Sequence, residues 1–327
     1  MLNSESLNKF ERSLVTKSVA EENSIPAAIT DVGCERDLNE DRYSVIESSS
    51  GLLWLVCDGM GGVKGGELAA QLVIDTIRRN LDSNIYEDVA TAIGESILES
   101  NRVIVLRRQN PMFSQMGTTI VGAMFNGREV AITHVGDSRA YLVRGDSIQQ
   151  LTEDHTYVQH LVNNQQIKLE DAMSHPQAHV LTKAIGSESG LKLDTKKYWI
   201  WNVENKAEQD FLVLVTDGLY SLVDDNEIAK YVNEYTPQDA SSKLVELSKK
   251  RGGYDNITIA IIPLTGQLKS TPPANYLPAK PKIKVKKQKQ SIKDLLPYIA
   301  KNFFIVFGLT LICLVLVVVV ILFSLSK

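Results

Sequence analysis

The chain has 327 residues, of which 44% are hydrophobic and 23% are charged, so it has the apolar material for a packed core and not the composition of a disordered chain. Its net charge of −4 is unevenly distributed, because residues 276–327 contain nine lysines against one acid, a local charge of +8. Residues 1–275 therefore carry −12, which argues against a nucleic-acid-binding body and suits a domain that concentrates cations.

The predicted elements begin after a polar N-terminal extension, residues 1–26, which lacks the apolar core of a secretory signal. Short β-branched runs bounded by Gly, Asp or Asn predict strands at 52–57, 118–125, 129–135, 139–144, 211–216 and 257–262. Helical periodicity predicts helices at 66–80, 86–109 and 237–250. Turn signals at Gly127 and Gly136 predict an antiparallel meander over 118–144. Because strands cluster and helices cluster, an α+β fold is favoured over a doubly wound parallel sheet.

The C-terminal part predicts a membrane anchor. Residues 303–323 form an apolar run without a charge, and a helix with a rise of ~1.5 Å per residue would carry them across roughly 30 Å of hydrocarbon. We expect this transmembrane helix to end in a short extracytoplasmic tail, 324–327. Eight lysines between Lys280 and Lys301 place the preceding residues in the cytoplasm, so a single-pass protein of the cell membrane is expected.

The segment before that helix, 266–302, is rich in proline and lysine and predicts a solvated juxtamembrane linker. Its lysines either hold the chain against anionic lipid or only set the topology, and both interpretations stay open. The three cysteines, Cys34, Cys57 and Cys313, are odd in number and far apart, which argues against a disulfide framework and indicates a reducing compartment.

Acidic residues recur at the ends of the predicted strands. They are Glu40 with Asp41, Asp58, Asp137, Asp217 and Asp255. One Asp at a strand end is common as a turn former or a helix cap, but several can meet on one edge of a sheet. Clustered carboxylates repel one another unless cations neutralise them, and oxygen ligands select Mg²⁺ or Mn²⁺ over zinc.

Two further residues suit phosphate chemistry. Gly59 has no Cβ, so its carbonyl oxygen can approach an ion beside Asp58. A two-metal site bridged by one Asp would lower the pKa of a shared water, produce hydroxide at neutral pH and hold the oxygens of an in-line displacement. Arg36 can bind a phosphoryl group through its two-pronged guanidinium. These residues predict a metal-dependent phosphoester hydrolase.

The motifs that surround these residues resemble those of the metal-dependent protein phosphatase 2C family in its bacterial form. The matching segments are 36–41 (RDLNED), 56–62 (VCDGMGG), 116–121 (MGTTIV), 134–140 (HVGDSRA), 151–155 (LTEDH), 180–186 (VLTKAIG), 215–218 (VTDG) and 255–256 (DN). The resemblance covers 27–265. It implies a β-sandwich of two antiparallel sheets flanked by α-helices, and hydrolysis of phosphoserine and phosphothreonine in proteins by direct attack of water.

The resemblance also implies the metal ligands of a site with two Mn²⁺ or Mg²⁺ ions. Asp58 would bridge both ions, and the Gly59 carbonyl would bind one of them. Asp217 and Asp255 would complete the other shell, so the three aspartates are the expected catalytic residues.

Further roles follow from the same resemblance. Glu40 and Asp41 would orient metal-bound waters, and Asp137 would join Asp217 at a third, weaker metal site. Arg36 would bind the substrate phosphate.

The chain departs from the family pattern in the loop after Asp58. Relatives often carry a histidine where this chain has Met60 or Val63, so no leaving-group acid is assigned and a metal-bound water is the hypothesis for that role. His155 is closest to a motif, but we expect it to be structural. The segment that follows it, through Met173 and His175, corresponds to the family's mobile flap.

Competing interpretations remain. The main alternative is a membrane-anchored pseudophosphatase that binds phosphoproteins without turnover; retention of Asp58, Asp217 and Asp255 favours catalysis. Hydrolysis of a small phosphoester at the membrane is a second alternative. A cysteine mechanism is excluded because no arginine stands six residues after Cys34 or Cys57. The expected partners are phosphorylated proteins, the substrates of a Ser/Thr kinase, and the membrane that anchors the chain. No nucleic-acid partner is expected.

Overall fold

The computed structural model describes residues 24–61, 65–187, 190–202, 209–273 and 276. All of them belong to one of the chain's two units, residues 1–283, and the second unit, 284–327, lies outside them. The predicted transmembrane span at 303–323 and most of the N-terminal extension are therefore outside the described residues. Within the described ranges, no helix has the length and apolar character needed to cross a bilayer.

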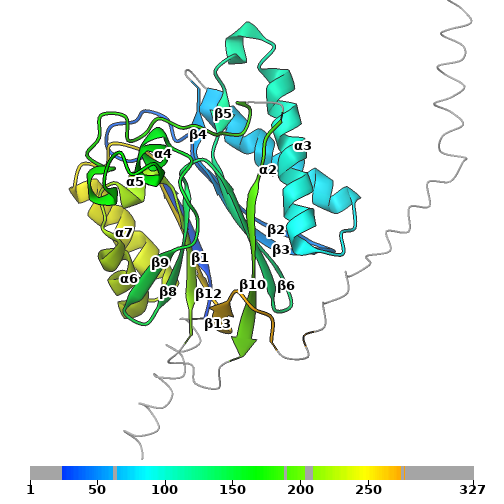
Figure 1. The fold of residues 1–327 in the computed structure, drawn as a ribbon, viewed down its shortest axis with the longest axis vertical. Helices are drawn as coiled ribbons and strands as arrows, with labels where there is room; N and C mark the ends of the chain where they lie inside the picture. Colours follow the sequence, from blue (N-terminus) through cyan, green and yellow to red (C-terminus); the bar gives the residue numbers. More distant parts are fainter. Residues whose placement is uncertain (1–23, 62–64, 188–189, 203–208, 274–275, 277–327) are drawn as a thin grey trace, which may run out of the picture. The chain divides into compact units, whose positions relative to one another are not determined.

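Two antiparallel sheets form the centre of the domain (Figure 1). The first sheet has the order β1 (Ala27–Asp31), β12 (Ile257–Pro263), β11 (Phe211–Val215), β8 (Arg139–Arg144), β9 (Ser147–Gln150). The second has the order β13 (Gly266–Lys269), β10 (Asp194–Asn202), β7 (Glu129–Val135), β6 (Ile120–Asn126), β3 (Gly51–Cys57), β2 (Arg42–Ser48). A short pair, β4 (Gly59–Met60) and β5 (Gly117–Thr118), lies beyond the end of β3.

Helices cover the outer face of each sheet (Figure 1). The second sheet packs against α2 (Gly65–Ser83) and α3 (Val89–Arg107). The first packs against α6 (Asp225–Glu234) and α7 (Pro237–Lys250). The short helices α4 (Tyr157–Asn163) and α5 (Asp217–Tyr220) and the 3-10 turns at Pro111–Phe113 and Leu169–Asp171 complete the described elements.

Three hydrophobic clusters hold these four layers together. One lies between the sheets and contains Val56, Val121, Leu212 and Leu214, and the other two lie between a sheet and its helices. Because both faces of the second sheet are covered, β7 is buried along its whole length, including its polar residues Glu129, Thr133 and His134. The predicted α+β sandwich with flanking helices is therefore confirmed.

The predicted meander is wrong in one step. β6 and β7 form a hairpin around Gly127, which has a φ of +60°. β8 does not pair with β7, however; it crosses to the other sheet and pairs with β11. The crossing begins at Gly136, whose φ of +103° favours glycine, and the three nearest atoms to a Cβ there would all belong to Thr119.

The predicted domain end at residue 265 falls too early. β13 lies in the stretch predicted as linker and pairs with β10, and Leu268 is 3% exposed. The Leu268 N–H donates to buried Asp210 at 2.6 Å, and Asp210 also forms an ion pair with Arg144 at 2.7 Å. These contacts satisfy a carboxylate that burial would otherwise destabilise, so β13 is part of the folded domain.

A chain that ends at residue 265 should therefore be less stable than one that ends at residue 276. Losing Leu268 and one donor to Asp210 costs about 3–5 kcal/mol, which lowers the melting temperature by about 10 °C in a domain of this size. Thermal unfolding of the two chains measures the difference. Equal melting temperatures would show that β13 contributes nothing to the fold.

Candidate active site

The acidic residues singled out in the sequence, apart from Asp41, meet at one end of the sheets. Figure 1 shows β4 and α5 at this end. Asp58 follows β3, Asp137 lies between β7 and β8, and Asp217 is the first residue of α5. A cavity of about 470 Å³ opens between them. Its lining includes Arg36, Glu40, Asp58, Gly59, Met60, Asp137, His179, Asp217 and Asp255. Of the predicted site residues, only Asp41 lies outside the lining.

Burial and the neighbouring negative charges raise the pKa of three carboxylates of the site, Asp58, Asp137 and Asp255. Burial, followed by the charges of Asp41 and Asp217, raises the pKa of Asp58 well above its ordinary value. Burial and the charge of Asp217 raise the pKa of Asp137 to about 7, and the same two causes raise the pKa of Asp255. Such a cluster favours the uptake of protons or cations, because either one relieves the repulsion. Asp58 keeps part of its surface toward the cavity, where a cation can reach it.

Asp41 supports the site from behind. It is 1% exposed, and its Oδ2 accepts hydrogen bonds from the Thr216 and Thr258 hydroxyls at 2.8 and 2.7 Å. Burial raises its pKa to about 7 even though both hydroxyls oppose that shift. The structure therefore connects Asp41 to the segments that carry Asp217 and Asp255, and its predicted role in orienting water stays a prediction.

Position 59 must be glycine because of packing, whether or not its carbonyl binds an ion. A Cβ at this position would lie 2.3 Å from the Gly66 carbonyl oxygen and 2.6 Å from that of Glu40. The Gly66 N–H also donates to Glu40 Oε1 at 3.1 Å. The start of α2 therefore sits directly against β4, and only glycine fits between them.

The residues present fit divalent metal ions. Asp217 Oδ1 is buried and has no hydrogen-bond partner among the described residues, which is costly for a carboxylate unless a cation binds it. The acidic groups of the lining supply only oxygen ligands, the type that Mg²⁺ and Mn²⁺ prefer. Among the described residues, no group of three or more Asp, Glu, His or Cys side chains is already arranged closely enough to hold a metal ion.

Arg36 lies at the edge of the cavity, where a phosphate could reach it. Its Nη2 donates to Asp255 Oδ2 at 2.7 Å, and its side chain is 52% exposed. A guanidinium has five N–H donors, so this ion pair orients Arg36 and leaves donors for a ligand.

A comparison with protein families identifies the chain. Residues 35–249 match the family model described as protein phosphatase 2C, and this match covers more than half of the sequence. The chain belongs to the protein phosphatase 2C family. The family resemblance inferred from the motifs is confirmed.

Known relatives of this phosphatase agree with that assignment. The serine/threonine phosphatase stp of Listeria innocua is 33% identical over 240 residues, which are 71% of this chain and 93% of the relative. The structure of Stp1 from Staphylococcus aureus has a TM-score of 0.68 at 33% identity, and the match covers 74% of this chain and 95% of that one. The catalytic domain of PstP, solved in complex with two manganese ions, has a TM-score of 0.62 at 30% identity and covers 72% of this chain and 96% of that one. The chain is a serine/threonine protein phosphatase of a metal-dependent family.

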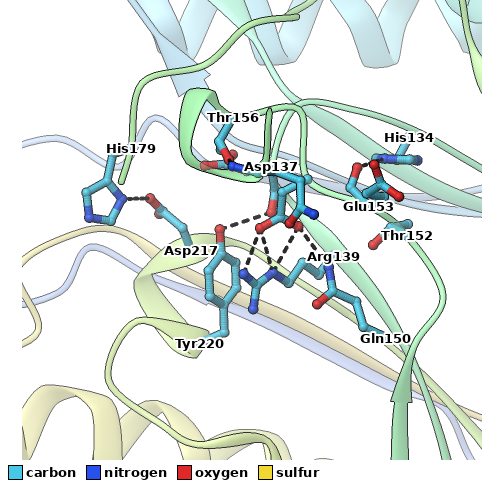
Figure 2. Close-up of polar contacts among 12 residues, drawn as sticks. His134, Asp137, Arg139, Gln150, Thr152, Glu153, Thr156, His179, Asp217 and Tyr220 are labelled. Atoms are coloured by element: carbon cyan, nitrogen blue, oxygen red, sulfur yellow. Dashed lines mark hydrogen bonds and ion pairs between the residues drawn. The ribbon is translucent and has the colours of Figure 1, made fainter. Parts of the chain in front are cut away.

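His179 is a residue of the phosphatase site that sequence reasoning missed. Its Nδ1 lies 3.3 Å from Asp217 Oδ2, and Figure 2 shows the ring beside that carboxylate. The hydrogen bond to Asp217 raises the pKa of His179. Nothing in its spacing marks it, because it belongs to the flap segment and only the fold brings it to Asp217. The mobility predicted for this flap stays a prediction.

His155 has the contacts of a structural histidine, as predicted. It stacks on His134 with ring centroids 4.5 Å apart, and its Nδ1 accepts a hydrogen bond from the Gly136 N–H at 3.1 Å. Its Nε2 lies 2.6 Å from Asp194 Oδ2. These contacts fix the turn that carries Asp137.

The stability that His155 contributes to the phosphatase should depend on pH. Burial lowers the pKa of both His155 and His134, so folding favours their neutral forms. Stability gained this way is present above the unfolded pKa of about 6.5 and is lost as pH falls through the lower folded pKa. Wild type should exceed His155→Gln by about 1–2 kcal/mol at pH 7.5 and by less at pH 5.5, measured by urea unfolding. A gap that widens on acidification contradicts this assignment.

Proposed function

We propose that the chain hydrolyses phosphoserine and phosphothreonine in proteins with two Mn²⁺ or Mg²⁺ ions. Asp58, the Gly59 carbonyl, Asp217 and Asp255 would hold the two ions, and Asp137 with Asp217 would hold a third ion more weakly. The observation that carries the proposal is the buried, unpartnered Oδ1 of Asp217 in a cavity lined by acidic groups. The relatives, which are named as serine/threonine phosphatases, support the substrate class.

The ions would supply a deprotonated water as nucleophile at neutral pH and neutralise charge on the phosphoryl oxygens. The chain's own residues bind and orient the substrate. Arg36, held at the edge of the cavity by Asp255, presents N–H donors to the phosphate. Thr119 accepts a hydrogen bond from the Asp58 N–H at 3.0 Å, and its own N–H donates to the Asp58 carbonyl at 2.8 Å. These two bonds fix the backbone of Asp58 at the wall of the cavity.

The substrate class is tested with full-length protein at saturating Mn²⁺. We expect kcat/KM for a phosphothreonine peptide to exceed that for a small aryl phosphate by at least ~100-fold, because the protein substrate adds binding outside the cavity. Equal values for both substrates favour the small-phosphoester alternative. Tight peptide binding without phosphate release at any Mn²⁺ or Mg²⁺ concentration favours the pseudophosphatase alternative.

We also propose that the chain is tethered to the cytoplasmic face of the cell membrane. The support is the charge-free apolar run at 303–323, which has eight lysines shortly before it and one after it. Tethering would bring the phosphatase close to substrates of a Ser/Thr kinase at the same membrane.

Cell fractionation tests this location. The full chain should remain with membranes after an alkaline carbonate wash, whereas a chain ending at residue 276 should be released. Protease added outside intact cells should leave the phosphatase domain uncut. Recovery of the full chain in the washed supernatant would contradict the anchor.

A further inference from the structure

A buried polar network forms around Arg139, which Figure 2 shows near Asp137. Asp154 is its main partner. The Arg139 Nε donates to both carboxylate oxygens of Asp154 at 3.0 Å, and Nη2 donates to Oδ2 at 2.7 Å. The two side chains are 14% and 9% exposed. Gln150 adds a donor to Asp154 at 2.8 Å, so the carboxylate is fixed from two sides. The guanidinium therefore has one orientation.

That orientation places Arg139 over an aromatic ring of the active-site helix. The Arg139 Cζ is 3.6 Å from the centroid of the Tyr220 ring, and Nη1 donates to the Tyr141 hydroxyl at 2.9 Å. A guanidinium over an aromatic face at this distance attracts the ring and restricts its movement. Tyr220 is therefore held in place by a group that is itself fixed.

The fixed ring points its hydroxyl at the backbone of a proposed metal ligand. The Tyr220 hydroxyl donates to the Asp137 carbonyl oxygen at 3.0 Å, and Figure 2 shows this bond beside Asp217. Tyr220 and Asp217 belong to the same short helix, α5, and are three residues apart. Residues three apart lie one above the other on a helix surface. The single turn of α5 thus contacts the Asp137 carbonyl through Tyr220 and also carries Asp217.

We infer that Tyr220 is a positioning residue that sets the distance between Asp137 and Asp217, and thereby the affinity of the weaker metal site that these two aspartates share. This inference rests on the proposed metal role of Asp137 and Asp217. Without the hydroxyl, the turn at Gly136–Asp137 loses its connection to α5, and the two carboxylates are no longer held at a fixed spacing. Groups that orient metal ligands in this way change metal affinity without touching the ion.

The competing explanation is that the hydroxyl only satisfies a buried carbonyl group. Both explanations predict some loss of stability when the hydroxyl is removed. Only positioning predicts a change in metal affinity that depends on the Asp137 carboxylate.

Tyr220→Phe in the full-length protein separates the two, because it removes one oxygen and keeps the ring under Arg139. We expect the dissociation constant of the weakest Mn²⁺ site, measured by calorimetric titration without substrate, to rise about tenfold. The Mn²⁺ concentration for half-maximal phosphate release should rise with it. Tyr235→Phe is the matched control. The Tyr235 ring also has a cation over its face, Lys243 Nζ at 4.8 Å from the centroid, but Tyr235 is the C-cap residue of α6 and lies outside the site. This control should leave Mn²⁺ binding unchanged.

A double-mutant cycle with Asp137→Ala completes the test. Once the Asp137 carboxylate is gone, Tyr220→Phe should change Mn²⁺ binding by less than about twofold. An equal shift in both backgrounds, or no shift in the wild-type background, overturns the inference and leaves the proposed function standing. A wild-type protein that binds no Mn²⁺ overturns the proposed function and this inference together.

Discussion

Replacing Asp58 by asparagine should abolish phosphate release and at the same time raise the melting temperature of the metal-free protein. The amide keeps the shape of the side chain but removes the charge that would bridge both metal ions, so activity should fall at least ~1000-fold, or about 4 kcal/mol of transition-state stabilisation. The same change relieves repulsion from Asp41 and Asp217, the two charges that most strongly raise the pKa of Asp58. We expect a gain of about 2 kcal/mol and a shift of about 5 °C.

Phosphate release with Mn²⁺ and thermal unfolding with EDTA measure the two effects. Asp146→Asn, in the exposed turn between β8 and β9, is the control and should change neither quantity. An Asp58→Asn protein that keeps a tenth of the activity, or melts below wild type without metal, would refute the view of Asp58 as the centre of a repulsive ligand cluster.

Gly59→Ala should destabilise the fold and reduce activity at the same time. The added Cβ would lie 2.3 Å from the Gly66 carbonyl oxygen, and that atom belongs to the backbone at the start of α2 and cannot rotate away. β4 and α2 must therefore separate, at a cost of about 3 kcal/mol and about 10 °C in melting temperature. Moving β4 also displaces Asp58, so activity should fall at least ~100-fold.

Gly190→Ala is the matched control, because a Cβ there meets no atom of the described residues within 4 Å. It should stay within about 0.5 kcal/mol of wild type. Equal melting temperatures for Gly59→Ala and Gly190→Ala would show that β4 and α2 are not packed as closely as described.

The central strands can be predicted from the sequence because a hydrophobic cluster covers each of their two faces. Short β-branched segments bounded by turn residues locate β7 and β8 to the residue, and the cap at Thr236 locates α7. The carboxylates can be predicted because most of them directly follow or precede such a run. β10 was not predicted, since its sequence DTKKYWIWN mixes charged and aromatic residues and resembles neither a strand buried on both faces nor a regular alternation.

The features that the sequence could not reveal depend on contacts between distant segments. The crossing at Gly136 is decided by which sheet offers β8 a partner. β13 is stabilised through Asp210, which lies 58 residues before Leu268 in the chain. His179 reaches Asp217 only because the fold brings the flap segment to the cavity. The bond from Tyr220 to the Asp137 carbonyl involves a backbone atom, which leaves no mark in the sequence.

The central claim is that the carboxylate cluster makes this chain a metal-dependent phosphatase for phosphoserine and phosphothreonine. The most direct measurement is phosphate release from a phosphothreonine peptide by the full-length protein, titrated with Mn²⁺ after removal of metal with EDTA. We predict no release without metal and saturable release as Mn²⁺ is added, with Asp58→Asn inactive throughout. Release that is unaffected by EDTA, or no release at any Mn²⁺ or Mg²⁺ concentration, would contradict the account.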